Sequence, residues 1–213
     1  MSELAVKLTA FVLAYLLGSI PSSVWIGKAF FGVDVREHGS GNAGATNTLR
    51  VLGKPAGFTV LGLDFLKGFL AASLVLWFDD LNYSPYRMEL KMLLGVCAVL
   101  GHIYPIFAGF RGGKGIATLI GVVAGIDIML ALACMITFVI IVAITKYISL
   151  GSMLSGLLSP LFAGLIHSWD EMNLVYFCSV VGVLVVYTHR SNIKRLMAGN
   201  ENKLALNKKP SQT

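Results

Sequence analysis

The chain has 213 residues, of which 56% are hydrophobic and only 13% are charged. Soluble domains carry about 25% charged residues, so this composition and a mean hydropathy of +0.76 exclude that class. The apolar residues fall in separate runs of about 17 to 25, the length that a helix needs to cross a bilayer core. Strand-like alternation is missing from these runs, so the sequence predicts an all-α polytopic membrane protein.

Seven transmembrane helices are expected, and the first of them is read as a retained span and not as a cleaved signal. Their approximate limits are residues 4–26, 56–78 and 90–110, then a short and a full span within 116–145, then 153–166 and 172–188. Pro21 predicts a kink in the first span. The run 116–145 is too long for one span, and Gly125-Ile126-Asp127 is its expected break. We expect residues 1–201 to form a single seven-span domain, followed by a disordered basic cytoplasmic tail at 202–213.

Basic residues divide unequally between the two sides of this arrangement. One side receives Lys28, Arg36, Arg50, Lys54, Arg111, Lys114, Lys146, Arg190, Lys194, Arg195, Lys203, Lys208 and Lys209, and the other receives Lys7, Arg87 and Lys91. The positive-inside rule therefore predicts an external N-terminus and a cytoplasmic C-terminus in the cell (inner) membrane. This bias and anionic lipid headgroups explain the net charge of +6, so nucleic acid is not an expected partner.

A polar, glycine-rich stretch follows the first span. Residues 39–47 read Gly-Ser-Gly-Asn-Ala-Gly-Ala-Thr-Asn, and Arg50 follows them. Glycines allow backbone N–H groups to converge on an oxyanion, and an arginine adds a planar charged fork. The match to G-x-G-x-x-G lacks the βαβ context of a dinucleotide-binding motif, which excludes a Rossmann fold. We expect this stretch to bind the phosphate of a small substrate.

A second glycine-rich turn, residues 111–115, reads Arg-Gly-Gly-Lys-Gly. It is not a complete P-loop, because Gly115 stands where Ser or Thr would hold magnesium, so an NTPase is not expected. The remaining interpretation is an anion-binding turn with Lys114 as a point charge. A short basic turn that merely obeys the positive-inside rule is the alternative.

Two further polar segments fall on the same predicted cytoplasmic face. Ser149 and Ser152 flank a helix start, where helix capping is the alternative to a role in the site. His189 and Asn192 lie about one helical turn apart and can project toward one pocket. Since all four unusual polar segments share one face, we expect them to form a single site at the boundary between membrane and cytoplasm.

Charged and polar residues inside the spans have two interpretations each. Asp64 and Lys67, three residues apart, should either pair with each other or line the site. His102 is either a structural histidine or a substrate contact. The cysteines have no metal-like spacing and are read as buried packing thiols, so no metal site is expected; they are Cys97, Cys134 and Cys178.

Together these motifs resemble one family, the bacterial integral-membrane glycerol-3-phosphate acyltransferases that use acyl-phosphate as donor (the PlsY family). The matching stretches are residues 16–21, 39–47, 63–68, 101–105, 110–118 and 189–196, with Gly199. They run in order from the first span to the tail, so the resemblance covers nearly the whole chain. One departure is Arg111, where the family commonly has lysine.

The resemblance implies transfer of the acyl group to the 1-hydroxyl of glycerol 3-phosphate, giving 1-acylglycerol 3-phosphate (lysophosphatidic acid) and phosphate, the first step of phospholipid synthesis. It implies no cofactor and no obligate protein partner beyond the substrates and membrane lipid. The family's functional positions carry over onto Ser40, Arg50, Lys114, Ser152, His189 and Asn192. Further substrate-binding residues are expected at Gly39, Gly41, Asn42, Gly44, Thr46, Asn47, Asp64, Lys67, His102, Arg111, Gly112 and Gly113.

Two questions stay open at the level of sequence. The chain has no His-x-x-x-x-Asp signature, so either a substrate phosphate or His189 takes the hydroxyl proton. A membrane transporter for phosphate or phosphorylated metabolites is the alternative function, and a lipid-binding scaffold is a third.

Overall fold

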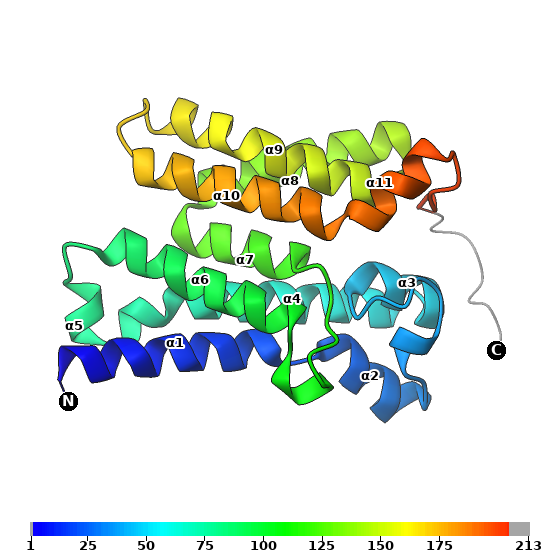
Figure 1. The fold of residues 1–213 in the computed structure, drawn as a ribbon, viewed down its shortest axis with the longest axis horizontal. Helices are drawn as coiled ribbons and strands as arrows, with labels where there is room; N and C mark the ends of the chain where they lie inside the picture. The colour runs from blue at the N-terminus through cyan, green and yellow to red at the C-terminus, as the bar shows by residue number, and fades with distance from the viewer. Residues whose placement is uncertain (1, 205–213) are drawn as a thin grey trace. The chain divides into compact units, whose positions relative to one another are not determined.

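The computed structural model describes residues 2–204, apart from the side chain of Asp79, and all regular structure in that range is helical (Figure 1). The all-α prediction is therefore confirmed for these residues. The chain divides after Ile126 into two compact units, which are described separately below. The predicted single domain over residues 1–201 stays a prediction, and most of the predicted tail lies outside the described residues.

The first unit ends at Ile126 and is built from long apolar helices and short polar ones. Its elements are α1 (Glu3–Ser19), α2 (Ser22–Phe31), η1 (Val35–Glu37), α3 (Ala45–Leu52), α4 (Lys54–Ser73), η2 (Leu74–Trp77), α5 (Asp79–Asn82), α6 (Arg87–Ile103), η3 (Ile106–Ala108) and α7 (Ile116–Ile126). Helix α4 packs along α7 and α1 packs along α6 (Figure 1). The α4–α7 contact is close enough that a Cβ on Gly68 would collide with the carbonyl oxygen of Thr118.

The first expected span is broken, as Pro21 predicts. Helices α1 and α2 are bent by 41° relative to each other, and Ile20 between them is extended. A break of this kind leaves backbone carbonyls without intrahelical donors. The Nζ of Lys67 in α4 donates to the carbonyl of Ile20 at 2.9 Å, so a charged side chain from a neighbouring helix stabilises the break.

The sequence analysis places no helix between the first and second spans, but residues 45–52 form α3. Gly44 precedes the helix in an extended conformation, and its carbonyl accepts hydrogen bonds from the N–H groups of Asn47 and Thr48. Asn47 and Thr48 are buried, whereas Thr46 and Arg50 are exposed. The polar composition therefore reflects a short helix with one buried face and one face available to a ligand.

The second unit begins at Asp127 and consists of α8 (Ile128–Thr145), α9 (Ile148–Ile166), α10 (Met172–Thr188) and α11 (Arg190–Met197). Helix α9 packs against both α8 and α10. The predicted break at residues 125–127 is confirmed: one oxygen of Asp127 accepts the N–H of Leu130 at 2.7 Å, and the other lies 2.8 Å from Nε2 of His167. An N-cap aspartate thus starts α8.

Within the described residues, four helices are long and apolar enough to cross a membrane, or up to six if each bent pair is one span. The bent pairs are α1 with α2 and α10 with α11. The remaining expected span corresponds to α7, whose 11 residues rise only about 16 Å, roughly half of a bilayer core. A polytopic helical protein is therefore supported, and the count of seven spans stays a prediction.

Candidate active site

The glycine-rich stretch is folded around the side chain of Asn47. The Oδ1 of Asn47 accepts the N–H of Ser40 at 2.8 Å and its hydroxyl at 3.1 Å. The Nδ2 of Asn47 donates to the carbonyls of Val35 at 2.7 Å and His38 at 3.1 Å. Gly39 has a φ of 61°, and a Cβ there would collide with Asn47 Oδ1. Asn47 thus supports the loop from inside, and its predicted contact with substrate stays a prediction.

At the start of the glycine-rich loop, the backbone N–H groups are already used in hydrogen bonds within the protein and do not point at an anion site. The N–H of Ser40 donates to Asn47, and the N–H of Gly41 donates to the carbonyl of His38 at 3.1 Å. By helix geometry, the N–H groups of Ala45 and Thr46 in the first turn of α3 have no intrahelical acceptor. Thr46 is exposed on the same turn, so the donors that could meet the expected anion lie at the start of α3.

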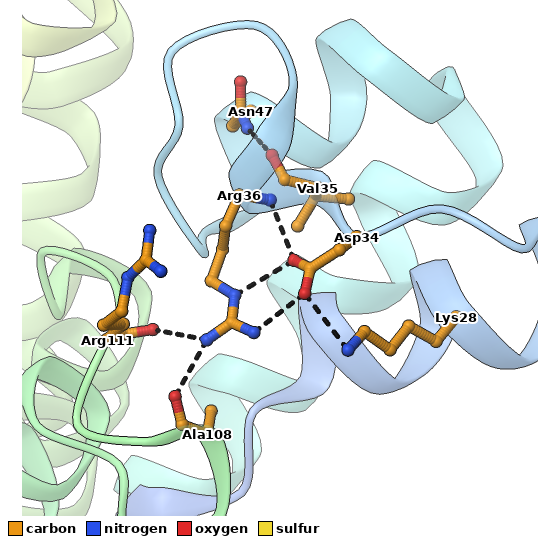
Figure 2. A network of polar contacts seen from close by, with 7 residues as sticks. All are labelled: Lys28, Asp34, Val35, Arg36, Asn47, Ala108 and Arg111. Carbon is orange, nitrogen blue, oxygen red and sulfur yellow. Dashed lines mark hydrogen bonds and ion pairs between the residues drawn. The ribbon is translucent and has the colours of Figure 1, made fainter.

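The segment before this loop is held by an aspartate–arginine pair (Figure 2). Asp34 Oδ1 accepts the backbone N–H and the Nε of Arg36, both at 3.0 Å, and its Oδ2 accepts Nη2 at 2.8 Å. The hydrogen bond from Arg36 holds the pKa of Asp34 well below its usual range, and the carboxylate raises the pKa of Arg36. The pair is therefore charged throughout the physiological pH range.

The Arg-Gly-Gly-Lys turn doubles back on the end of α6. The N–H of Gly112 donates to the carbonyl of Ile103 and the N–H of Gly113 to that of His102, both at 3.2 Å. A Cβ on Gly113 would collide with Nε2 of His102 and lie 3.0 Å from the carbonyl oxygen of Ala43. The glycine therefore allows this turn to pack directly against the glycine-rich stretch, as expected for parts of one site. Lys114, the next residue, is half-buried.

A buried polar cluster lies next to the Arg-Gly-Gly-Lys turn, whose Gly113 packs against His102. Asp64 and Lys67, 2% and 5% exposed, form an ion pair of 2.9 Å. Asp64 Oδ1 also accepts the hydroxyl of Ser22 at 3.1 Å. His102 Nδ1 lies 3.8 Å from the same oxygen and 3.1 Å from the hydroxyl of Thr118. The first alternative for Asp64 and Lys67, a pair with each other, is confirmed, and substrate contacts by these residues stay predictions.

In the second unit, three of the expected catalytic residues are buried: Ser152 near the start of α9, His189 between α10 and α11, and Asn192 in α11. The hydroxyl of Ser152 donates to the carbonyl of Ile148 at 3.0 Å. His189 Nδ1 lies 2.8 Å from the carbonyl of Val185, so the neutral ring carries its proton on Nδ1 and its acceptor lone pair on Nε2. His189 and Asn192 are 3% and 6% exposed.

Glu201 is the residue of this unit that the sequence analysis missed. Its Oε1 accepts the hydroxyl of Ser149 at 2.9 Å and the side-chain amide of Asn192 at 2.6 Å, and its Oε2 accepts Nε of Arg195 at 2.7 Å. Burial acts to raise the pKa of Glu201, but the hydrogen bonds from Asn192, Arg195 and Ser149 outweigh it and lower the pKa. The sequence does carry one signal for this residue, since Glu201 is an isolated acidic residue in a basic segment. The backbone beyond it is also held, since the N–H of Leu204 donates to Lys146 O at 2.7 Å.

Among residues 2–204, no group of three or more His, Cys, Asp or Glu residues is arranged so that it could hold a metal ion. The carboxylates of Asp34, Asp64 and Glu201 are paired with donors of the protein, and the exposed or half-buried polar residues of the two glycine-rich segments include cations and hydroxyls, namely Arg50, Lys114, Ser40 and Thr46. Such a set binds and orients anions and hydroxyl groups.

Comparison with known proteins gives matches over nearly the whole chain. The family model described as glycerol-3-phosphate acyltransferase matches residues 8–199. Proteins named glycerol-3-phosphate acyltransferase are similar, one from Bacillus cereus being 44% identical (93% of this chain, 96% of the relative) and one from Chlorobaculum tepidum 39% identical (95% and 98%).

Solved structures give the same result. The crystal structure of PlsY (YgiH), an integral membrane glycerol 3-phosphate acyltransferase, in its glycerol 3-phosphate form has a TM-score of 0.83 and 39% identity, covering 93% of this chain and 96% of that one. Its lysophosphatidic acid form has a TM-score of 0.80 and 38% identity, with coverage of 94% and 96%.

The carboxylate of Glu201 is expected to stabilise the second unit. Replacing Glu201 by glutamine puts an NH2 group in place of one of the two acceptor oxygens, and we expect a loss of about 1–3 kcal/mol in unfolding free energy at pH 7. Because the folded-state pKa of Glu201 is lowered, the parent's advantage is present above the ordinary glutamate pKa of about 4.3 and is lost as the pH falls through the folded-state pKa.

Thermal unfolding of purified protein in detergent at pH 7 and at lower pH measures this difference. Glu171→Gln is the control, because Glu171 is an exposed carboxylate of the same unit. The interpretation fails if Glu201→Gln unfolds at the parent temperature at pH 7.

Proposed function

Because the chain belongs to the glycerol-3-phosphate acyltransferase family, we propose that it transfers the acyl group of acyl-phosphate to the 1-hydroxyl of glycerol 3-phosphate. The products are 1-acylglycerol 3-phosphate and phosphate. The observation that carries this proposal is the packing of the Arg-Gly-Gly-Lys turn against the glycine-rich stretch, where Ala43 and Gly113 meet. That contact joins two anion-binding segments in one unit.

Two phosphate-bearing substrates must be held close together without being driven apart. Two unit charges 4 Å apart repel by about 4 kcal/mol at an effective dielectric of ~20, and each phosphate carries more than one charge at neutral pH. We propose that two cations offset this repulsion, Arg50 on α3 and Lys114 on the turn. The hydroxyl of Thr46 and the N–H groups at the start of α3 add neutral donors. The hydroxyl of Ser40, which donates to Asn47 Oδ1 in this structure, is proposed to turn toward a substrate phosphate.

The reaction needs little covalent help from the protein. The substrate hydroxyl oxygen attacks the acyl carbon, the bond from that carbon to the phosphate oxygen breaks, and phosphate leaves with its electron pair. A mixed anhydride is already activated for this step, so orientation and charge compensation supply most of the required acceleration. We assign the hydroxyl proton to a phosphate oxygen of a substrate.

Ser152, His189 and Asn192 are proposed to orient glycerol 3-phosphate in the same reaction. Their side chains are held by the contacts described above, with Glu201 fixing Asn192 at 2.6 Å. A fixed amide and an imidazole suit hydrogen bonds to hydroxyl and phosphate oxygens. The acyl chain of donor and product is proposed to run between helices into the lipid.

We further propose seven spans with an external N-terminus and a cytoplasmic C-terminus, so that both loops of the site face the cytoplasm of the cell (inner) membrane. The excess of basic residues on the loop side supports this orientation. A reporter protein that fluoresces only in the cytoplasm, fused after Thr213, is expected to be fluorescent, and the same reporter before Met1 is expected to be dark. The reverse pattern would refute the orientation.

The enzymatic proposal is tested by phosphate release from acyl-phosphate, dependent on glycerol 3-phosphate, by the purified protein in detergent. Transport has no meaning without a membrane barrier, so release there excludes a transporter as the sole function. Lys114→Met is expected to lower kcat/KM by about 10²–10³-fold. Lys54→Met is the matched control, because Lys54 is an exposed cation at the start of α4, and it should stay near the parent value. Equal effects of both substitutions would contradict the assignment.

A second experiment separates the two proton acceptors. His189→Asn keeps a donor near the carbonyl of Val185 and removes Nε2. If substrate phosphate takes the proton, the variant should show a raised KM for glycerol 3-phosphate and a fall in kcat of less than about 10-fold. If His189 is the general base, kcat should fall by about 10²–10⁴-fold at every pH while the KM is retained.

A further inference from the structure

Arg36 enters the sequence analysis only as one of many inside charges, but the structure gives it a defined set of partners. Its guanidinium is forked on the carboxylate of Asp34, and the side chains of Arg36 and Asp34 are only 15% and 10% exposed. Lys28, 58% exposed, contacts the same carboxylate at 3.2 Å. The buried fork is thus formed by Arg36, and Lys28 contributes from the surface.

The remaining guanidinium nitrogen reaches a different segment of the chain. Nη1 of Arg36 donates to the carbonyl of Ala108 at 2.8 Å and to that of Arg111 at 3.4 Å. In Figure 2 the side chain of Arg111 points away from this network, so Arg111 takes part through its backbone. Ala108 lies just before the Arg-Gly-Gly-Lys turn, and Arg111 is the first residue of that turn, three residues before Lys114.

The segment that carries Arg36 is attached on its other side to the glycine-rich stretch. The carbonyls of Val35 and His38 accept both hydrogen bonds donated by Asn47 Nδ2, and Asn47 holds Ser40. One short segment, residues 34–38, therefore bonds to both anion-binding segments at once (Figure 2).

We propose that Arg36, fixed by Asp34, is a positioning residue that sets the turn bearing Lys114 against the glycine-rich stretch. The effect of Arg36 on catalysis rests on the acyl transfer proposed above. A guanidinium has the geometry for this task, because its planar fork binds both carboxylate oxygens and still presents a further N–H to a carbonyl. A lysine has one nitrogen and cannot span the same distance with fixed orientation. The carbonyls of Ala108 and Arg111 would then lose their charged donor.

The test compares Arg36→Lys with Lys28→Met in two measurements on the purified full chain. The first is amide hydrogen exchange of peptides covering residues 106–116, with residues 128–145 as an internal reference. Arg36→Lys should speed exchange at 106–116 by about 10-fold or more and leave the reference unchanged. Lys28→Met, which leaves the fork intact, should keep the parent rates.

The second measurement is steady-state kinetics. Displacing a charged group by about 1 Å costs on the order of 10²-fold, so Arg36→Lys should lower kcat/KM by roughly 30- to 100-fold. Lys28→Met should stay within about twofold of the parent, as expected for an exposed ion pair. Arg36→Lys keeps a positive charge beside Asp34 and so avoids the unfolding that Arg36→Met risks. A purely structural role would lower the melting temperature without a selective change at 106–116.

The proposal is overturned if Arg36→Lys exchanges like the parent at residues 106–116, or if exchange increases there while kcat/KM stays within twofold. Exchange requires no turnover, which separates this result from the proposed function. A parent protein that releases no phosphate refutes the acyl transfer, and the exchange data then still decide whether Arg36 holds the turn.

Discussion

Polar groups inside an apolar helical bundle must find their partners within the protein, because the surrounding lipid offers none. In the first unit Lys67 satisfies this requirement twice, through Asp64 and through the carbonyl exposed by the break at Ile20. In the second unit Glu201 accepts three side-chain donors. Both arrangements fix polar backbone and side chains at the points where long helices end, and the candidate site residues are attached to those points.

This constraint divides the polar residues into two groups. Asn47, Asp34 and Arg36 direct their side chains toward other parts of the protein and shape the loops. Ser40 on the glycine-rich loop and Thr46 and Arg50 on α3 are exposed, where an anion can reach them. The site that we propose for two phosphate-bearing substrates needs both groups, because a cation stabilises a bound anion most when its own position is fixed in advance.

The sequence was a good guide wherever one residue dominates the local physics. Pro21 predicts the bend between α1 and α2, and Asp127 in a glycine-containing break predicts the start of α8. Both follow from backbone chemistry that acts over a few residues. The two glycine-rich segments could also be recognised from the sequence, because segments of small and polar residues have almost no apolar side chains to bury in a membrane protein.

Longer-range roles could not be read in the same way. Helix α3 was missed because its buried face is only Asn47 and Thr48, which in sequence look like loop residues. Arg36 was missed because its contact with the distant segment is to the backbone carbonyl of Ala108, and Glu201 was missed because Ser149 lies 52 residues away in the chain. Spacing alone carries no information about such contacts.

The ion pair in α4 has one further consequence. A single charge fixed inside a bilayer feels the transmembrane voltage, which does about 2.3 kcal/mol of work per elementary charge per 100 mV across the full field. Asp64 and Lys67 lie 2.9 Å apart, so to that field they form a small dipole of zero net charge. The ion pair therefore places a strongly polar group among the helices without adding a net charge on which the transmembrane voltage could act.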